Sequence, residues 1–208
     1  MKRYRIISCD KTENLKDVSK LIRDGAIIVF PTDTIYGIGC NPFIVKSVEK
    51  IFEIKKRDRT KALPILTSTI EDAKKLIELN YIGERLVKKF WPGALTIVGK
   101  IKADIKLPEI ITSKRDTLAV RMPDHKCALT ILRYCKYLVG TSANISNYKS
   151  ITSSEDIINS RLEGFDILID GNITTIGIES TIVDITKEKL SVIRKGAISV
   201  DKLYGVIN

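Results

Sequence analysis

Apolar runs alternate with amphipathic segments along the chain, and this alternation predicts a layered α/β fold. The run from Ala26 to Phe30 is apolar without interruption and lies between Gly25 and Pro31. Such a run is typical of a strand that is covered on both faces. Residues 14–23 instead place apolar side chains three and four positions apart, which predicts an amphipathic helix that ends near Gly25.

The same patterns assign most of the remaining chain. We expect a second helix to begin with Asn41 as its cap and Pro42 in its first turn. Further strands are predicted over residues 5–8, 62–66, 95–101, 117–122, 137–140, 166–169, 181–185 and 190–194, and further helices over 70–79, 82–90, 127–135, 154–159 and 200–204. Residues 102–116 and 148–154 are predicted loops. Because no repeat or linker divides the chain, we expect residues 1–208 to form a single α/β domain with a twisted mixed β-sheet flanked by helices.

Composition and charge narrow the class of protein. A chain of 208 residues that is 44% hydrophobic can bury a full core. It contains no apolar run long enough to cross a bilayer, so we expect no membrane partner and a cytoplasmic location. The net charge of +10 favours a polyanionic partner, which could be a nucleotide, a nucleic acid or an acidic surface.

The cysteines do not indicate a metal site. Cys9, Cys40, Cys127 and Cys135 include no CxxC pair, and His125 is the single histidine. This pattern excludes the commoner cysteine–histidine metal frameworks and favours a reducing compartment.

A polar, glycine-containing tract follows the predicted buried strand. It reads Pro-Thr-Asp-Thr-Ile-Tyr-Gly-Ile-Gly over residues 31–39. In open α/β sheets, ligands bind at the carboxyl ends of such strands, and glycines let a ligand approach the backbone. An ordinary strand-ending turn is the alternative. The P-loop fingerprint is absent and Pro42 takes the place of the third glycine of a dinucleotide fingerprint, so a nucleotide would bind in another mode.

A cluster of cations follows the predicted second helix, formed by Lys55, Lys56, Arg57, Arg59 and Lys61. The helix macrodipole stabilises positive charge at a carboxyl end, so a solvated basic turn is one interpretation. An anionic ligand would relieve the repulsion within the cluster, and a planar guanidinium is well shaped to bind phosphate.

Two further strand ends carry polar groups. Arg121 directly follows Leu-Ala-Val, and an ionised side chain must be paired if it is buried. Either the carboxylate of a ligand or an internal acid would pair it. Residues 141–147 offer hydroxyl and amide groups that bind a ligand or cap a helix.

Seven motifs occur in an order that resembles one family. They are PTDTIYGIG at 31–39, KKRDRTKALPIL at 55–66, FWPGALTIV at 90–98, LAVRMPDH at 118–125, TSANIS at 141–146, ESTIVD at 179–184 and VIRKG at 192–196. Together they resemble the YrdC-type threonylcarbamoyl-AMP synthases over nearly the whole chain. The resemblance implies a YrdC-like fold with a concave basic cleft, in the short single-domain form.

The resemblance also implies a reaction. L-threonine, bicarbonate and ATP would give threonylcarbamoyl-AMP and pyrophosphate, with Mg²⁺ accompanying ATP and no organic cofactor. The product would serve the threonylcarbamoyl modification of tRNA adenosine 37, through a downstream threonylcarbamoyl transferase complex. Binding of tRNA or double-stranded RNA is a further expectation.

Site residues carry over where this sequence matches the family motifs. The residues expected to contact L-threonine are Thr34, Arg121, Ser142 and Ser180, and those expected to contact ATP are Arg57, Lys61, Thr117, Asn144, Thr152 and Arg194. Lys55 and Arg57, from the Lys-x-Arg motif, are the expected catalytic residues, and Lys55 would neutralise phosphate charge. Tyr36 is expected near them by its place in the loop.

Three positions depart from the family pattern. Asp58 stands where many relatives have proline, Lys61 replaces an asparagine, and Leu66 stands where some relatives have a histidine that contacts threonine. Without the proline, the loop around Asp58 is less rigid. Lys61 exchanges an amide for a charge, and Leu66 removes one expected contact with threonine.

Three other functions compete with this interpretation. A non-enzymatic RNA-binding module would explain the charge, but an aromatic content of 6% argues against readout of bases by stacking. A carbamoyl-transfer domain of hydrogenase maturation proteins would share the fold, but it normally accompanies zinc-finger-like cysteines. A serine hydrolase would depend on His125, and no Gly-x-Ser-x-Gly elbow precedes any serine.

Overall fold

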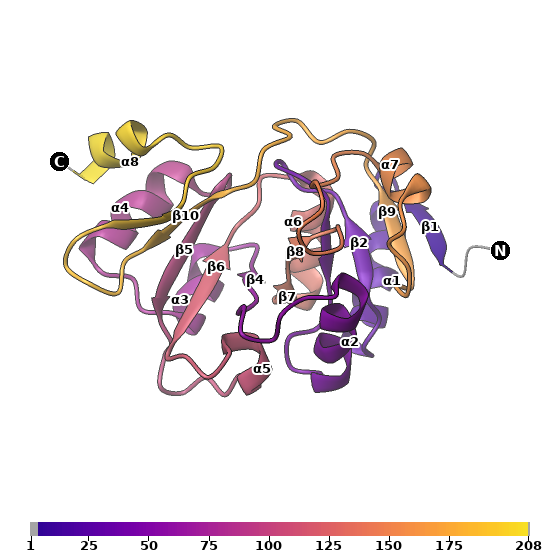
Figure 1. Ribbon diagram of the computed structural model, residues 1–208, viewed down its shortest axis with the longest axis horizontal. Helices are drawn as coiled ribbons and strands as arrows, with labels where there is room; N and C mark the ends of the chain where they lie inside the picture. The colour runs from indigo at the N-terminus through magenta and orange to yellow at the C-terminus, as the bar shows by residue number, and fades with distance from the viewer. Residues whose placement is uncertain (1–3, 208) are drawn as a thin grey trace.

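The computed structural model describes residues 4–207, and its strands form two mixed sheets that are flanked by helices (Figure 1). The first sheet has the order β1 (Arg5–Ser8), β9 (Ile167–Asp170), β2 (Ile28–Phe30), β3 (Gly37–Gly39) and β8 (Thr141–Ser142). The second has the order β11 (Ser191–Arg194), β10 (Thr181–Asp184), β5 (Leu95–Lys100), β6 (Thr117–Arg121), β4 (Ile65–Leu66) and β7 (Leu138–Val139). The predicted α/β class with mixed strand directions is confirmed. The sequence did not predict that the strands divide into two sheets.

The helices bury apolar side chains, which formed the stripes that predicted every helix except α5. They are α1 (Thr12–Arg23), α2 (Val45–Lys55), α3 (Ile70–Leu76), α4 (Tyr81–Phe90), α5 (Glu109–Thr112), α6 (Lys126–Cys135), α7 (Ser154–Asn159) and α8 (Val200–Ile207). Helices α1 and α6 pack together against the first sheet, where Leu15, Val18 and Ile131 join Phe30 in one buried cluster. This packing removes apolar surface from water and fixes the sheet that carries the polar tract at 31–36.

The structure corrects the predicted start of the second helix. Helix α2 begins at Val45, and Asn41 instead accepts the Phe43 N–H through Oδ1 at 3.0 Å. The short amide side chain closes a local turn before the helix, which is a common alternative use of asparagine. The predicted loop 102–116 also contains the short helix α5.

Residues 31–36 of the polar tract form the turn of a hairpin. Strand β3 pairs antiparallel with β2, so residues 31–36 connect two strands of the first sheet. The pattern of the sequence did not predict β3, because its Gly-Ile-Gly sequence carries little strand signal. A Cβ at Gly39 would lie 1.9 Å from the Val139 carbonyl oxygen, so only glycine allows this close approach of β3 to β7.

Two segments carry the chain between the sheets. Gly140 alone separates β7 of the second sheet from β8 of the first, and a Cβ there would lie 2.5 Å from Leu66. Residues 171–180 run from β9 to β10 along the top of Figure 1. The backbone of this segment is held against the polar tract, because Ile176 N donates to Asp33 O at 3.0 Å and Gly177 N to Thr34 O at 2.9 Å.

Cys9 and Cys127 are joined by a disulfide between the end of β1 and the start of α6. Their separation of 118 residues gave no sign of this pairing in the sequence. Cys40 and Cys135 are free. Among residues 4–207, no helix combines the length and the apolar character needed to cross a bilayer.

Candidate active site

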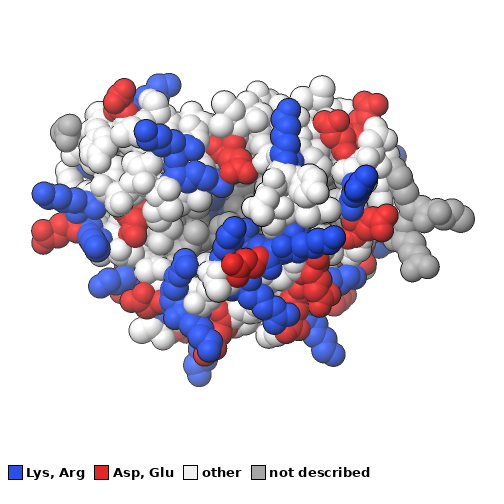
Figure 2. Space-filling model, viewed as in Figure 1, with Lys and Arg blue, Asp and Glu red and all other residues white. Residues whose placement is uncertain are grey.

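A cavity of about 800 Å³ lies between the two sheets. Both sheets contribute to its wall, and Figure 2 shows Lys and Arg side chains gathered around the hollow on this face. The lining cations are Lys55, Arg57, Lys61, Arg115, Arg121 and Arg194, against the lining acids Glu179 and Asp184. The volume is typical of a site for a nucleotide-sized ligand, and the charge favours an anion.

The structure brings together every predicted site residue except one. Thr34, Lys55, Arg57, Lys61, Thr117, Arg121, Ser142, Asn144, Ser180 and Arg194 all line the cavity. Thr152 is not part of its wall as the structure describes it. Its carbonyl instead accepts the Thr174 N–H at 2.8 Å, which fastens the segment that joins β9 to β10.

Arg121 is a buried cation with a fixed set of partners. It ends β6, and its Nη2 lies 2.6 Å from Asp33 Oδ1 while its Nη1 donates to Thr34 Oγ1 at 2.9 Å. Its Nε donates to the Gly93 carbonyl at 2.9 Å. Burial lowers the pKa of Arg121 from its ordinary value, and the carboxylate of Asp33 opposes this effect. Of the two partners left open by the sequence, the internal acid is therefore present.

The guanidinium of Arg121 keeps donors for a ligand. It carries five N–H groups, and the bonds to Asp33, Thr34 and Gly93 use one on each nitrogen. One N–H on each Nη then remains as a donor for a ligand in the cavity that Arg121 lines. Asp33 is held in turn by the Asp124 N–H at 3.1 Å, so the acid cannot turn away from the arginine without losing a second bond.

Lys55 ends α2 and points into oxygen atoms of the loop after β8. Its Nζ donates to the carbonyls of Ser142 and Asn144, the latter at 2.7 Å, and lies 3.3 Å from Asn144 Oδ1. Burial and the neighbouring charge of Arg57 lower the pKa of Lys55 to about 7. The amine therefore fixes the Ser-x-Asn loop and sits close to its point of protonation at neutral pH.

Arg194 and Glu179 form a half-exposed pair at the edge of the cavity. Arg194 Nη1 contacts Glu179 Oε2, and Nε and Nη2 donate to the Ser180 carbonyl at 3.1 and 2.9 Å. Ser150 Oγ donates to the other oxygen of Glu179 at 2.8 Å. The Ser180 hydroxyl lies 3.2 Å from Arg194 Nη2 and 2.8 Å from the Thr96 hydroxyl.

The Lys-x-Arg loop is closed by its own side chains. Arg57 donates to the carbonyls of Lys61 and Ala62 at 3.2 and 2.9 Å. Asp58, in the place of the family proline, accepts the Thr60 N–H at 2.9 Å. This hydrogen bond lowers the pKa of Asp58, with smaller contributions from the cations beside it. A side-chain turn thus restrains the loop where the sequence had predicted lower rigidity.

Sequence reasoning missed some contributors to the site. Asp33 and Glu179 each form an ion pair with an arginine. Both lie in family motifs, but the sequence pointed only to their neighbours Thr34 and Ser180 as contact residues. Tyr36 lines the cavity, but its hydroxyl donates to the Asn172 carbonyl at 2.9 Å and accepts the Gly171 N–H at 3.0 Å. Tyr36 therefore secures the segment at 171–180 instead of presenting its hydroxyl to a ligand.

A family model described as "Telomere recombination", for Sua5, YciO and YrdC proteins, matches residues 20–196. The chain belongs to this family. Within the family, the threonylcarbamoyl-AMP synthase of Pyrococcus abyssi is 37% identical over 188 residues, which are 89% of this chain and 55% of that protein. The synthase of Bacillus subtilis is 32% identical over 198 residues, 93% of this chain and 56% of that protein. The chain thus spans about half the length of these two relatives.

Solved structures of the Sua5/YciO/YrdC family share the fold. The crystal structure of P. abyssi Sua5 complexed with L-threonine superposes with a TM-score of 0.91 at 33% identity, over 98% of this chain and 60% of that one. E. coli YciO superposes with a TM-score of 0.86 at 22% identity, over 98% of this chain and 100% of that one, which shows a common fold alone.

Proposed function

We propose that this protein is a threonylcarbamoyl-AMP synthase, which condenses L-threonine, bicarbonate and ATP to threonylcarbamoyl-AMP and pyrophosphate. The names of two relatives and the threonine complex of P. abyssi Sua5 support the proposal. The observation that carries it is that the residues expected to contact threonine and all but Thr152 of those expected to contact ATP line one cavity. A condensation of two anions requires this adjacency.

The proposed route uses no protein nucleophile. Bicarbonate takes up a proton and loses water to give carbon dioxide. The amine of threonine attacks the carbon dioxide and gives up a proton, which balances the one that bicarbonate takes up. An oxygen of the resulting carbamate then displaces pyrophosphate from the α-phosphorus of ATP. Arg121 binds the carboxylate of threonine, while Arg57 and Arg194 stabilise the charge that builds on the leaving pyrophosphate. Mg²⁺ enters as part of the MgATP substrate.

Ser180 is the proposed meeting point of the two substrates. Thr96 lies opposite Arg121 in the register of β5 and β6, and the Ser180 hydroxyl joins Thr96 to Arg194 through contacts of 2.8 and 3.2 Å. A small hydroxyl therefore lies between the cation proposed for the carboxylate and a cation proposed for the phosphates. We infer that the carbamate forms beside it.

Pyrophosphate release from MgATP tests the proposal, with L-threonine or bicarbonate omitted in turn and with serine substituted for threonine. We expect release that requires both co-substrates and prefers threonine. ATP binding without release would indicate that the chain needs a partner for activity. Failure to bind nucleotide, with tRNA binding retained, would favour the RNA-binding module.

The net charge of +10 supports a second, weaker proposal, that tRNA contacts this protein while a downstream threonylcarbamoyl transferase uses the product. The serine hydrolase alternative has lost its support. His125 lies outside the cavity wall as described and caps α6, because its Nδ1 accepts the Cys127 N–H at 3.3 Å.

A further inference from the structure

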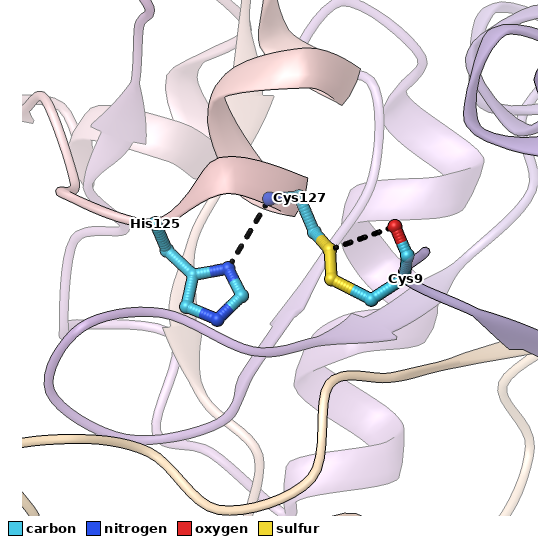
Figure 3. Close-up of side chains that lie close together, drawn as sticks. All are labelled: Cys9, His125 and Cys127. Atoms are coloured by element: carbon cyan, nitrogen blue, oxygen red, sulfur yellow. Dashed lines mark hydrogen bonds between the residues drawn. A yellow bond between two sulfur atoms is a disulfide. The ribbon is translucent and has the colours of Figure 1, made fainter. Parts of the chain in front are cut away.

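Cys9, His125 and Cys127 lie close together (Figure 3). Cys9 follows β1, and the other two residues lie at the start of α6. One ligand atom from each residue lies within 4.8 Å of the other two. Within residues 4–207, the wall of the active-site cavity does not include them, so the proposed synthase reaction leaves this cluster without a role.

The disulfide explains only part of the arrangement. A Cα–Cα distance of 5.7 Å between Cys9 and Cys127 is ordinary for a disulfide, and the same distance is compatible with two thiolates on one metal ion. A disulfide has no need of the imidazole beside it. His125 turns Nδ1 toward the start of α6, where its bond to the Cys127 N–H is long at 3.3 Å (Figure 3).

Two sulfurs and one imidazole nitrogen form a donor set that suits zinc. Zn²⁺ binds thiolate and imidazole ligands in tetrahedral geometry, and three protein ligands leave a fourth position for water. We propose that, once the disulfide is reduced, Cys9, Cys127 and His125 bind a zinc-type divalent ion. Because the ion and the disulfide use the same two sulfurs, they exclude each other.

The exchange between the two states balances with a dithiol reductant. The reductant supplies two electrons and two protons, so the bond between the sulfurs of Cys9 and Cys127 breaks, two thiols form, and the reductant becomes a disulfide. The ion then forms two metal–sulfur bonds and releases the two thiol protons, while the imidazole donates a lone pair. Oxidation by a disulfide reverses the sequence and expels the ion.

Burial is consistent with this exchange. Cys9 and His125 are partly exposed, whereas Cys127 is buried. A reductant or an ion can therefore approach from the side of Cys9. Both the disulfide and the metal tie β1 to the start of α6, so the same backbone arrangement serves the oxidised and the reduced protein.

Cobalt titration of the full chain tests the site. Co²⁺ stands in for Zn²⁺, and thiolate coordination gives a charge-transfer band in the near ultraviolet. We expect the reduced protein to bind one equivalent with this band, and Zn²⁺ to abolish it by displacement. Cys9→Ser and Cys127→Ser should lose the band. His125→Asn, which retains a capping oxygen, should weaken it, and Cys135→Ser on the same helix should leave it unchanged.

Alkylation gives a readout that does not depend on variants. In the reduced wild-type protein, Zn²⁺ should protect the partly exposed Cys9 from iodoacetamide and leave Cys135 as reactive as before, as measured by peptide mass spectrometry. Oxidised protein should show the linked Cys9–Cys127 peptide and no cobalt band. A band that survives in the Cys9→Ser/Cys127→Ser double variant, its absence from the reduced wild type, or equal binding by oxidised protein would each overturn the proposal.

Discussion

Two arginine–acid pairs in the same cavity differ in their freedom to change partner. The side chains of Arg121 and Asp33 are 8% and 6% exposed, whereas those of Arg194 and Glu179 are 39% and 34% exposed. Removing one member of a buried pair costs about 3–5 kcal/mol, because the other charge is left without a partner. A pair near the surface contributes about 0–1 kcal/mol. The first pair is therefore a fixed part of the fold, and the second is exchangeable.

This difference matches the two proposed substrates. A carboxylate can reach the remaining N–H groups of Arg121 while Asp33 stays in place, so the receptor is set before threonine arrives. The phosphates of ATP carry more charge and can replace Glu179 at Arg194, where little stability is lost by the exchange. The comparison predicts separable effects of mutation at the two pairs.

Arg121→Ala should have the largest effect. It leaves Asp33 buried without a counter-charge and should lower the free energy of unfolding by about 3–5 kcal/mol, as measured by urea denaturation. In protein that remains folded, threonine use should fall far more than ATP binding. Arg121→Lys is the matched control, because it restores the charge without the two-pronged geometry and should recover stability more than threonine affinity. Equal losses for both substrates would contradict the assignment of Arg121 to the carboxylate.

Arg194→Ala should reverse this pattern. The loss of charge-assisted hydrogen bonds to phosphate should cost about 1.5–3 kcal/mol of ATP affinity, which calorimetry would record as roughly a 10- to 150-fold higher Kd. Stability should change by no more than about 1 kcal/mol. Arg57→Ala should likewise affect ATP more than threonine. Arg133→Ala, an exposed arginine of α6 outside the cavity wall as described, controls for net charge. If Arg133→Ala weakened ATP binding as much, long-range charge would be the cause.

Lys55 should take up protons when ATP binds. Burial lowers its pKa to about 7, and the incoming phosphates should raise that value. Near pH 8 the amine is mostly neutral in the free protein, so binding should draw protons from the buffer, whereas near pH 6 it is already charged and uptake should vanish. Calorimetry in buffers of different ionisation enthalpy measures the uptake. An unchanged uptake in Lys55→Met would assign the protons to another group.

The lowered pKa of Lys55 also determines whether its contribution to the free energy of unfolding rises or falls with pH. Lys55 has an ordinary pKa of 10.5, so between about pH 7 and that value the unfolded state binds more protons than the folded state. The contribution of Lys55 to stability therefore rises with pH across this window and is flat below it. Subtracting the pH profile of Lys55→Met from that of the wild type isolates the contribution.

Local patterns in the sequence predicted helices and strands better than the contacts between distant residues. Periodicity placed α7 at its observed residues and α1 to within two positions, because the apolar spacing of a helix is a local property. It failed at Asn41, where a side chain that can cap a helix closes a turn instead. The active site and the disulfide both depend on contacts between distant residues. Arg121 meets Asp33 across 88 positions and Cys9 meets Cys127 across 118, and no local pattern determines such a pair.

Glu179→Gln should change ATP affinity least among these variants, but the direction of the change tests the exchange model directly. Glutamine keeps the shape of the side chain and an oxygen for the Ser150 hydroxyl, but it no longer holds Arg194 by charge. If the pair must open for phosphate, ATP should bind more tightly, by up to about 1 kcal/mol, which is roughly fivefold.

Asp33→Asn makes the same chemical change at the fixed pair, yet it should destabilise the fold, because Arg121 would lose its buried counter-charge. Weaker ATP binding by Glu179→Gln would mean that Glu179 itself serves the nucleotide, for example by holding the metal ion that accompanies it, and the exchange model would then be wrong.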